Sequence, residues 1–308
     1  MSRIVLAPIS ILLSLSNCAC SAKQQSVRVE AQGSPSTAST RLPSPLPEKN
    51  NEKLDERISL GDGLYLVAKG IDEENDRLHY EISIGYPEIT GSNKAQVLRF
   101  NRLAASFAKL EAREYKKIQT GPREKLQPWW KDTKEYLSMT YDVIRADDRL
   151  ISVRFDKQTY TRGAAHAVQE FRVINYNLEE GRMLQLDELF RPNSKYLNII
   201  ADYCLDSLRK QNNKDCFEAT KDPRSGIDRG YCERVANKDF WLSEQGRPTS
   251  NNFQFWNLKN EGLLLSFEEC RMAGCMAGPR EVLIPYESLK TIAQPKGVLV
   301  RWISPSAR

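Results

Sequence analysis

The sequence predicts an α+β fold built from mostly antiparallel sheets with a few packed helices. Segments that alternate apolar and polar residues follow one another in runs, whereas two longer segments of helical periodicity stand apart from them. The 308 residues are 40% hydrophobic and 28% charged, which is typical of a soluble globular protein. About 250 residues follow the N-terminal tail described below, enough to bury a core without metals or many disulfides.

The first predicted elements are two strands, residues 63–71 and 78–90, joined by a charged turn around Asp72 to Asp76. The second segment alternates polar and apolar residues with a period of two, as a half-buried strand does. Residues 93–117 then repeat apolar side chains at helical spacing. The polar side of this helix carries the basic residues Arg99, Arg102, Lys109, Arg113 and Lys116. These cations can attract an anionic wall polymer, although we favour the interpretation that the face is simply exposed to solvent.

Three more strands and a second helix follow. Residues 135–160 indicate a hairpin with its turn at residues 146–149, and residues 166–178 indicate the next strand. Gly181 turns the chain, and a helix is predicted from about Asn193 to Lys210. A second hairpin around residues 260–262 and a strand running into a short helix at residues 280–293 complete the fold.

The N-terminus is typical of an export signal, which we place at residues 1–20. Arg3 precedes an apolar segment, residues 4–16, that is too short to span a bilayer. The stretch LSNC, residues 15–18, resembles a lipoprotein cleavage box and predicts a lipid on Cys18, with Cys20 or simple cleavage near Ala22 as alternatives. We therefore expect an exported protein of the cell envelope or periplasm, anchored to a membrane by its lipid.

Residues 21–58 are rich in Pro, Ser and charged residues. Such a stretch buries too little apolar area to offset the entropy of ordering it. We predict a disordered tether that holds the folded part away from the membrane.

Five cysteines lie in the folded region, and export makes disulfides possible among Cys204, Cys216, Cys232, Cys270 and Cys275. The closely spaced last two can close a small loop. Cys204 lies on the apolar side of the second predicted helix and can pair with Cys216 or Cys232. Because five is odd, one thiol stays free or pairs elsewhere. A metal site is not indicated, because the region contains no C-x-x-C pair and no histidine lies nearby in the sequence.

Composition argues against several classes of function. The net charge of +5 is mild and includes no long run of like charges, so we expect no nucleic-acid partner. No glycine-rich phosphate loop is present, and we expect no cofactor. Trp129 and Trp130 can stack on sugar rings if they are exposed, although buried tryptophans are more common.

The sequence offers little for catalysis. Only His79 and His166 can serve as an imidazole base, and the chain contains neither a G-x-S-x-G nor an H-E-x-x-H motif. Carboxylates that are adjacent in sequence, such as Asp147 and Asp148, point to opposite faces of a strand and are poor acid–base partners. We therefore expect a binding protein rather than an enzyme.

His166 is the residue on which the alternatives depend. It follows Gly163 and two alanines, a small-residue run that lets the backbone turn sharply before a strand. A histidine here can donate a ring N–H to a carbonyl and fix the loop, the role that we favour. Ligand recognition, together with Tyr160 and Gly163, is the second interpretation; catalysis or metal binding is the third.

The run YTRGAAHAVQEFRVINYNLEEGRMLQLDELF, residues 160–190, resembles the C-terminal domain family of the anti-sigma factor RsiV. A second match is the stretch EGLLLSFEECRMAGCMAGPREVLIPYESL, residues 261–289. Residues 80–91 and the following helix are similar to the companion domain of the same proteins. The sequence departs from the family pattern at Ala164, which replaces a glycine, and at Glu188, which is inserted. We place the companion region at residues 59–158 and the RsiV-like domain at residues 159–304.

This resemblance implies a recognition module with no chemistry of its own. In RsiV the region binds lysozyme, and in some peptidoglycan deacetylases it accompanies a separate catalytic domain. We expect this chain to bind a lysozyme-like protein or peptidoglycan. The alternatives are a cell-wall hydrolase or deacetylase-like enzyme that uses His166, and a structural envelope protein that binds another protein. The positive net charge repels basic lysozymes unless a local acidic patch offsets it.

Overall fold

The computed structural model describes residues 57–120, 133–222, 228–230, 232, 248–268 and 278–300. The chain divides into two compact units, Met1–Leu42 and Pro43–Arg308, and all described residues lie in the second. The buried residues of both hydrophobic cores lie between Leu60 and Leu299. A chain that begins at Pro43 therefore carries every residue of both cores, so we expect it to fold on its own.

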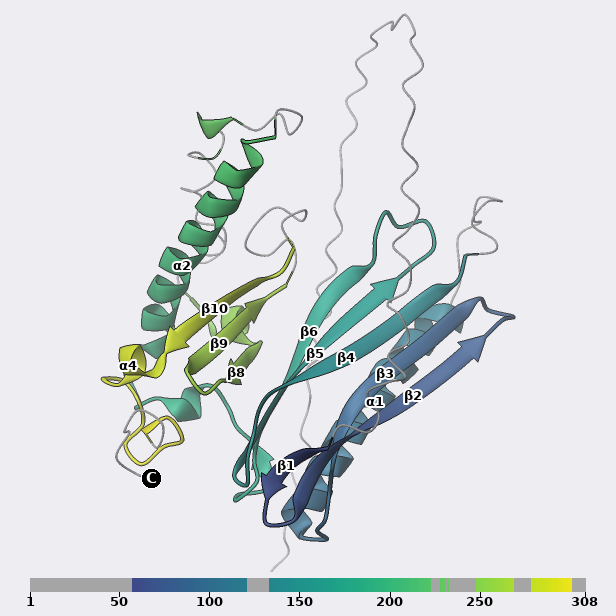
Figure 1. The fold of residues 1–308 in the computed structure, drawn as a ribbon, viewed down its shortest axis with the longest axis horizontal. Coiled ribbons are helices and arrows are strands. Elements are labelled where there is room, and N and C mark those ends of the chain that lie inside the picture. Colours follow the sequence, from purple (N-terminus) through teal and green to yellow (C-terminus); the bar gives the residue numbers. More distant parts are fainter. Residues whose placement is uncertain are drawn as a thin grey trace, which may run out of the picture. The chain divides into compact units, whose positions relative to one another are not determined.

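Seven strands form the larger sheet, and each lies beside the next in chain order: β1 (Ile58–Gly61), β2 (Leu64–Asn75), β3 (Tyr80–Thr90), β4 (Glu135–Ala146), β5 (Leu150–Tyr160), β6 (Val168–Asn177) and β7 (Arg182–Met183) (Figure 1). Neighbouring strands are antiparallel except β3 and β4, which are parallel. A parallel pair needs a long crossover, and helix α1 (Ala95–Thr120) supplies it. The predicted α+β class with mostly antiparallel sheets is confirmed.

Helix α1 covers one face of the seven-stranded sheet. Ala104, Ala108 and Ala112 recur every four residues on its buried side and are at most 5% exposed, so the helix backbone lies close to the strands. The amide of Asn101 ties the helix to β3, because it accepts from Ile89 N and donates to Ile89 O, each at 2.8 Å. The first core forms between this helix and the inner side chains of β2–β6.

Strands β2 and β3 extend further than the sequence predicts. The expected charged turn at Asp72 to Asp76 is wrong, because Asp72 pairs with Ser83 and Glu74 pairs with Glu81 inside the β2–β3 ladder. Asp and Glu are poor strand formers, which is why the pattern suggests a turn there. The observed turn is residues 76–79, where His79 has a φ of 54°.

Three antiparallel strands form the smaller sheet: β8 (Trp256–Leu258), β9 (Gly262–Phe267) and β10 (Arg280–Pro285). Helix α2 (Tyr196–Ala219) packs on one of its faces and, with the short α4 (Tyr286–Leu289) and the 3-10 helices η3 (Asp187–Leu189) and η5 (Ser250–Phe253), completes the second core. A Cβ on Gly262 would meet Ile284 O at 2.2 Å, so only glycine fits where β9 meets β10.

A buried polar cluster, the seam, joins the smaller sheet to the larger one. Ser152 Oγ donates to Asn175 Oδ1 at 2.6 Å, and it accepts from Asn257 Nδ2 at 3.0 Å and Leu258 N at 3.1 Å. Asn175 Nδ2 donates to Trp256 O at 2.7 Å. Ser152, Asn175 and Asn257 are at most 1% exposed. Since α1 packs on the opposite face of β5 and β6, the layers run α1, larger sheet, smaller sheet, α2.

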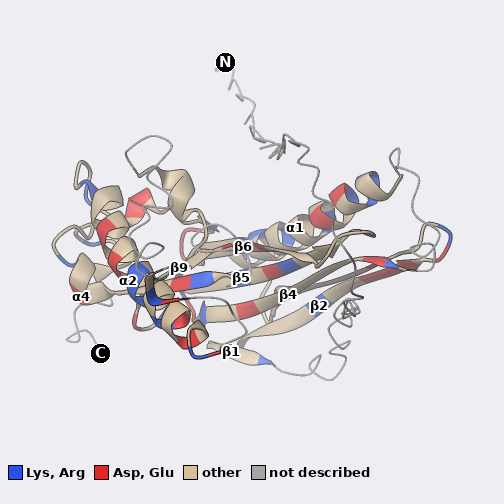
Figure 2. Ribbon diagram, turned by 90° about the horizontal axis from the view of Figure 1, so that it is seen from above, with Lys and Arg blue, Asp and Glu red and all other residues tan. Residues whose placement is uncertain are grey.

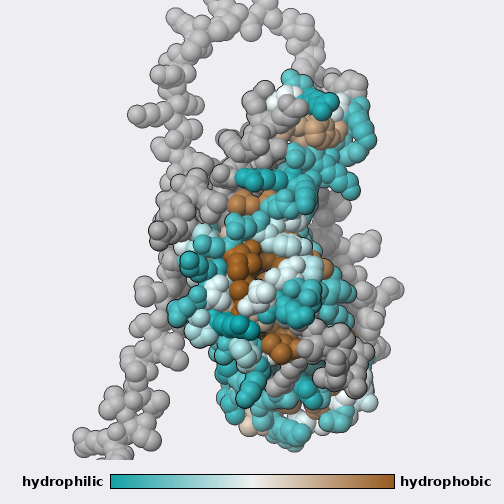
Figure 3. Space-filling view, turned by 90° about the vertical axis from the view of Figure 1, so that its left-hand side faces the viewer, coloured by the Kyte–Doolittle hydropathy of each residue, from teal (hydrophilic) through white to brown (hydrophobic). Residues whose placement is uncertain are grey.

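Helix α2 continues nine residues beyond its predicted end at Lys210. Its apolar residues are not all buried, since Ile199 and Phe217 are each 37% exposed. Figure 3 views the side on which α2 lies and shows isolated apolar groups among hydrophilic side chains. The expected domain boundary between residues 158 and 159 falls inside β5, a central strand of the larger sheet.

Candidate open face of the larger sheet

The side chains opposite α1, beyond the part of the sheet that the smaller sheet covers, form what we call the open face. Strand pairing aligns one polar row across five strands: Asp72, Ser83, Ser138, Gln158 and Gln169. None of these five residues is buried, and they have hydroxyl, amide or carboxylate groups. The row therefore presents hydrogen-bonding groups across five adjacent strands.

The open face is acidic although the whole chain is basic. Five carboxylates lie on it, and the alternation of each strand places them opposite α1: Asp72, Glu74, Glu81, Asp142 and Asp156. Two cations accompany them. Lys134 pairs with Glu74, and Arg154 pairs with Asp142 at 3.1 Å. Figure 2 marks acidic positions along these strands.

Arg154 marks the border between the open face and the covered part. Its guanidinium pairs with Glu281 of β10, donates to Ser266 Oγ at 3.2 Å, and lies 5.1 Å from the ring centre of Phe171. Its side chain is only 14% exposed. The cation is thus mostly engaged with the smaller sheet, which leaves the carboxylates to dominate the open face.

Asp156 is the open-face carboxylate most affected by its surroundings. Burial raises its pKa above the ordinary value, while the hydrogen bond from Gln169 and the charge of Arg154 act in the opposite direction. The Gln169 amide donates to Asp156 Oδ2 at 2.5 Å, and Oδ1 has no hydrogen-bond partner among the described residues. The ionised carboxylate is therefore only partly satisfied by the protein itself.

The loop between β5 and β6, residues 161–167, lies at one end of the open face. Glu135 Oε1 accepts from Arg162 Nε at 3.1 Å and from Arg162 N at 3.2 Å, and the two side chains are 4% and 8% exposed. Gly163 is exposed with a φ of 89°, a conformation that favours glycine. A buried ion pair thus holds the base of an exposed loop.

The structure brings three of the predicted binding residues together at this loop. His166 is exposed, and its Nδ1 lies 2.8 Å from Ala167 O, a contact of the kind expected for a histidine that fixes the loop. Tyr160 is only 3% exposed and stacks on Tyr136 with ring centres 5.7 Å apart. Burial, then the charge of Glu135, raises the pKa of Tyr160. The other predicted binding residues, Trp129 and Trp130, lie outside the described residues.

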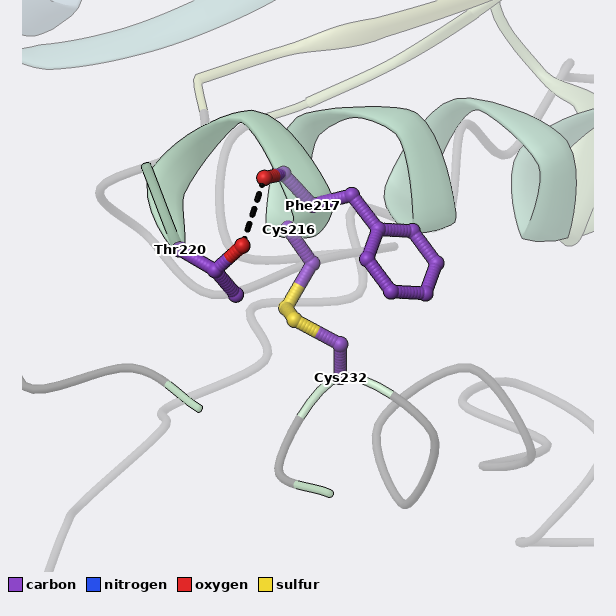
Figure 4. Close-up of a disulfide and its surroundings, with 4 residues drawn as sticks. All are labelled: Cys216, Phe217, Thr220 and Cys232. Carbon is purple, nitrogen blue, oxygen red and sulfur yellow. Dashed lines mark hydrogen bonds between the residues drawn. A yellow bond between two sulfur atoms is a disulfide. The ribbon is translucent and has the colours of Figure 1, made fainter. Parts of the chain in front are cut away.

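One disulfide joins Cys216 of α2 to Cys232, with the Cα atoms 5.5 Å apart (Figure 4). The expectation that Cys204 pairs with one of these cysteines is wrong, because Cys204 is a free, buried thiol. Cys204 and Cys216 are twelve residues apart on one continuous helix, or about 18 Å at 1.5 Å per residue. Burial strongly raises the pKa of the Cys204 thiol. Cys18, Cys20, Cys270 and Cys275 lie outside the described residues.

Sequence reasoning missed the open face. Its row depends on strand pairings such as that of Ser83 with Ser138, 55 positions apart, which the alternation of a single strand cannot give. The signal that was available is the acidic run DEEND, residues 72–76, together with the polar alternation of residues 81 and 83. Among the described residues, no three His, Cys, Asp or Glu side chains are placed to hold a metal ion. No described helix is long and apolar enough to cross a membrane.

Residues 187–287 match the model of a family described as a protein of unknown function, DUF3298. This segment runs from η3 through α2 and the smaller sheet to α4. The open face and the β5–β6 loop lie outside it.

The chain is also 21% identical over 218 residues to the peptidoglycan-N-acetylmuramic acid deacetylase PdaC of Bacillus subtilis (strain 168). The alignment covers 71% of this chain and 40% of that protein, so the chain spans less than half the length of this relative. A relation to peptidoglycan deacetylases is part of the expected resemblance and is confirmed at this level. Specificity of the RsiV type stays a prediction.

Two solved structures of DUF3298 family proteins are similar. The one from Bacteroides fragilis NCTC 9343 has 16% identity and a TM-score of 0.43, covering 75% of this chain and 94% of its own. The one from Pseudomonas aeruginosa PAO1 has 13% identity and a TM-score of 0.49, covering 77% of this chain and 97% of its own.

Proposed function

We propose that this chain is an extracytoplasmic recognition protein that binds a cationic ligand of the cell envelope, a lysozyme-like protein, on its open face. The observation that carries the proposal is the open face itself, where five carboxylates accompany two cations in a chain of net charge +5. Within a Debye length of about 8–10 Å a ligand responds to this local field rather than to the net charge.

The disulfide and the relative support the proposed compartment. A bond such as Cys216–Cys232 persists in oxidising compartments outside the cytoplasm. The relative PdaC is named for an activity on peptidoglycan, an envelope polymer. A lipid on Cys18 or Cys20 would keep the protein at a membrane, as the N-terminal sequence predicts.

The β5–β6 loop would provide the specific contacts. Recognition residues are commonly exposed loop side chains held by a rigid scaffold. His166 and Gly163 are exposed, and the Arg162–Glu135 pair fixes the loop base. Tyr160 would support the loop from below rather than touch a ligand, because it is buried.

A second candidate ligand is the peptidoglycan glycan. The hydroxyl and amide groups of Ser83, Ser138, Gln158 and Gln169 suit the hydroxyl and acetamido groups of such a polymer. The name of the relative PdaC favours this candidate. The carboxylates of the open face add nothing for a neutral glycan, so we place it second.

The test is direct binding of residues 43–308 to an animal-type lysozyme and to purified peptidoglycan, at low and at physiological salt. We expect saturable lysozyme binding that weakens with salt but survives at physiological ionic strength. Peptidoglycan binding alone would replace the first ligand with the second. No saturable binding to either would contradict recognition of both, and a single stoichiometric partner on co-purification would then favour a structural role.

The enzymatic alternative uses His166 as a general base on cell wall. It predicts that His166→Ala abolishes a measurable release of sugar or acetate while the melting temperature stays unchanged. A recognition protein predicts no such release from the wild-type chain. In that case His166→Ala changes only ligand affinity or stability.

A further inference from the structure

We propose that the outer face of α1 docks on an anionic phospholipid surface. This inference is independent of the proposed ligand on the open face. It starts from the ten residues of α1 between Leu98 and Ile118 that are exposed. Five of them are basic, one is acidic and three are large aliphatic residues; the basic ones are Arg99, Arg102, Lys109, Arg113 and Lys117.

The five cations form one stripe. At 3.6 residues per turn their positions fall within about 80° of arc around the helix, on the side opposite the buried Phe100, Ala104 and Ala108. The stripe extends from Arg99 to Lys117, or about 27 Å at 1.5 Å per residue. It is therefore long enough to contact several lipid headgroups at once.

Most of this charge is not neutralised by the protein. Arg99, Arg102 and Lys109 form no ion pair with another described residue. The only acidic residue of the outer face is Glu114, which lies 2.8 Å from Lys117 and 3.6 Å from Arg113. Lys116, counted with the basic face in the sequence, instead turns to the sheet and pairs with Glu73 at 2.8 Å.

Aliphatic side chains decide between a lipid surface and a hydrophilic polyanion. Leu98 and Leu110 flank the stripe on its two sides and are 46% and 41% exposed. A bilayer interface takes up such groups, because an interfacial helix combines basic and aliphatic residues. A phosphate-rich wall polymer offers them no apolar phase. The composition of the face therefore favours a membrane.

The placement of α1 gives this docking a consequence for the whole unit. Helix α1 lies on one face of the larger sheet (Figure 2). The alternation of the strands directs the carboxylates of the open face to the other. An anionic membrane attracts the first and repels the second. Docking through α1 would thus orient the open face away from the membrane.

The experiment measures partitioning of residues 43–308 onto vesicles of 30% phosphatidylglycerol and 70% phosphatidylcholine, and onto pure phosphatidylcholine. Each basic residue near an anionic surface is worth about a fivefold change in partition coefficient. We expect binding to the anionic vesicles only, and a loss of about a hundredfold for the triple variant Arg102→Gln/Lys109→Gln/Arg113→Gln.

The matched control removes three exposed cations elsewhere, Lys210→Gln/Lys221→Gln/Lys290→Gln, and should keep most of the binding. A second variant, Leu98→Ser/Leu110→Ser, should reduce binding several-fold at unchanged charge. All substituted residues are exposed, so unfolding curves should match the wild type. Equal binding to both vesicles, or an equal loss in the control, would overturn the proposal. So would binding to soluble polyphosphate together with failure to bind the vesicles.

Discussion

The same face of the larger sheet carries polar side chains at both of its ends, but the two ends differ in what covers them. At one end the seam of Ser152, Asn175 and Asn257 lies under the smaller sheet and is at most 1% exposed. At the other end Asp72 is exposed and the remaining residues of the polar row, as far as Gln169, are half-buried. Hydroxyl and amide groups occur at both ends, so these groups alone do not separate the covered end from the open one.

The hydroxyl and amide groups at the two ends have different roles in the fold. In the seam the hydroxyl of Ser152 and the amide nitrogens of Asn175 and Asn257 have protein partners, so these groups fix the position of the smaller sheet. On the open face Ser83 Oγ donates to Asp72 Oδ1 and Gln169 Nε2 donates to Asp156 Oδ2. The Ser138 hydroxyl and the Gln158 amide have no hydrogen-bond partner among the described residues and are left to water or a ligand. Stability should therefore depend on the covered end, and binding on the open end.

The largest expected effect on unfolding free energy is that of substituting Glu135. This residue tests the comparison because its buried charge lies at the open end, where most side chains contribute little to stability. Glu135→Ala leaves the Arg162 guanidinium buried without this partner and should cost about 3–5 kcal/mol of unfolding free energy. Urea unfolding measures this loss. Glu81→Ala, which removes a half-buried carboxylate at the same end, is the control and should cost under about 0.5 kcal/mol. Equal effects would show that the loop is not held by the pair.

The second-largest effect on stability compares the seam with the polar row directly. Asn175→Ala removes the acceptor of Ser152 and the donor to Trp256 O, so we expect a loss of about 2–3 kcal/mol. That corresponds to a fall of roughly 4–12 °C in melting temperature for a chain of this size. Ser138→Ala on the open row should change it by no more than about 1–2 °C. A large fall in melting temperature for Ser138→Ala would contradict the distinction between the covered end and the open end.

The smallest expected effect is a change in the pH dependence of stability when Asp156 is replaced by Asn. Its pKa is raised by burial, so the folded state binds the proton more tightly than the unfolded state does. Stability due to this group is present below the ordinary aspartate range and is lost as the pH rises through the folded-state pKa. Asp156→Asn should therefore stabilise the protein at pH 7, by less than about 1 kcal/mol, and not near pH 3. Thermal melts across this pH range measure it, and a loss at pH 7 would contradict the assignment.

Much of the fold was predictable because local patterns determined it. The 3.6-residue repeat of α1 and the hairpin turn before Leu150 are visible in the sequence and are present in the structure. The end of α2 was not, because the polar stretch QNNKD carries no periodic signal and the Cys216–Cys232 bond helps to hold that end.

The candidate site was predictable only in part. The motif around Gly163 and His166 pointed to a turn before a strand, and the structure has a turn there, immediately before β6. The buried partner of that loop, Glu135, lies 27 residues before Arg162 and has no local signal. The open face was hidden for the same reason, since its carboxylates come from separate strands and only the register brings them together.

The measurement that tests the central claim most directly compares the lysozyme affinity of residues 43–308 with that of Asp72→Asn/Glu81→Gln. The matched control, Asp206→Asn/Glu287→Gln, removes the same charge from α2 and α4. Calorimetric titration at physiological salt should show at least about a tenfold weaker affinity for the open-face variant and little change for the control. Equal affinity of all three proteins would contradict the assignment of the open face as the recognition surface.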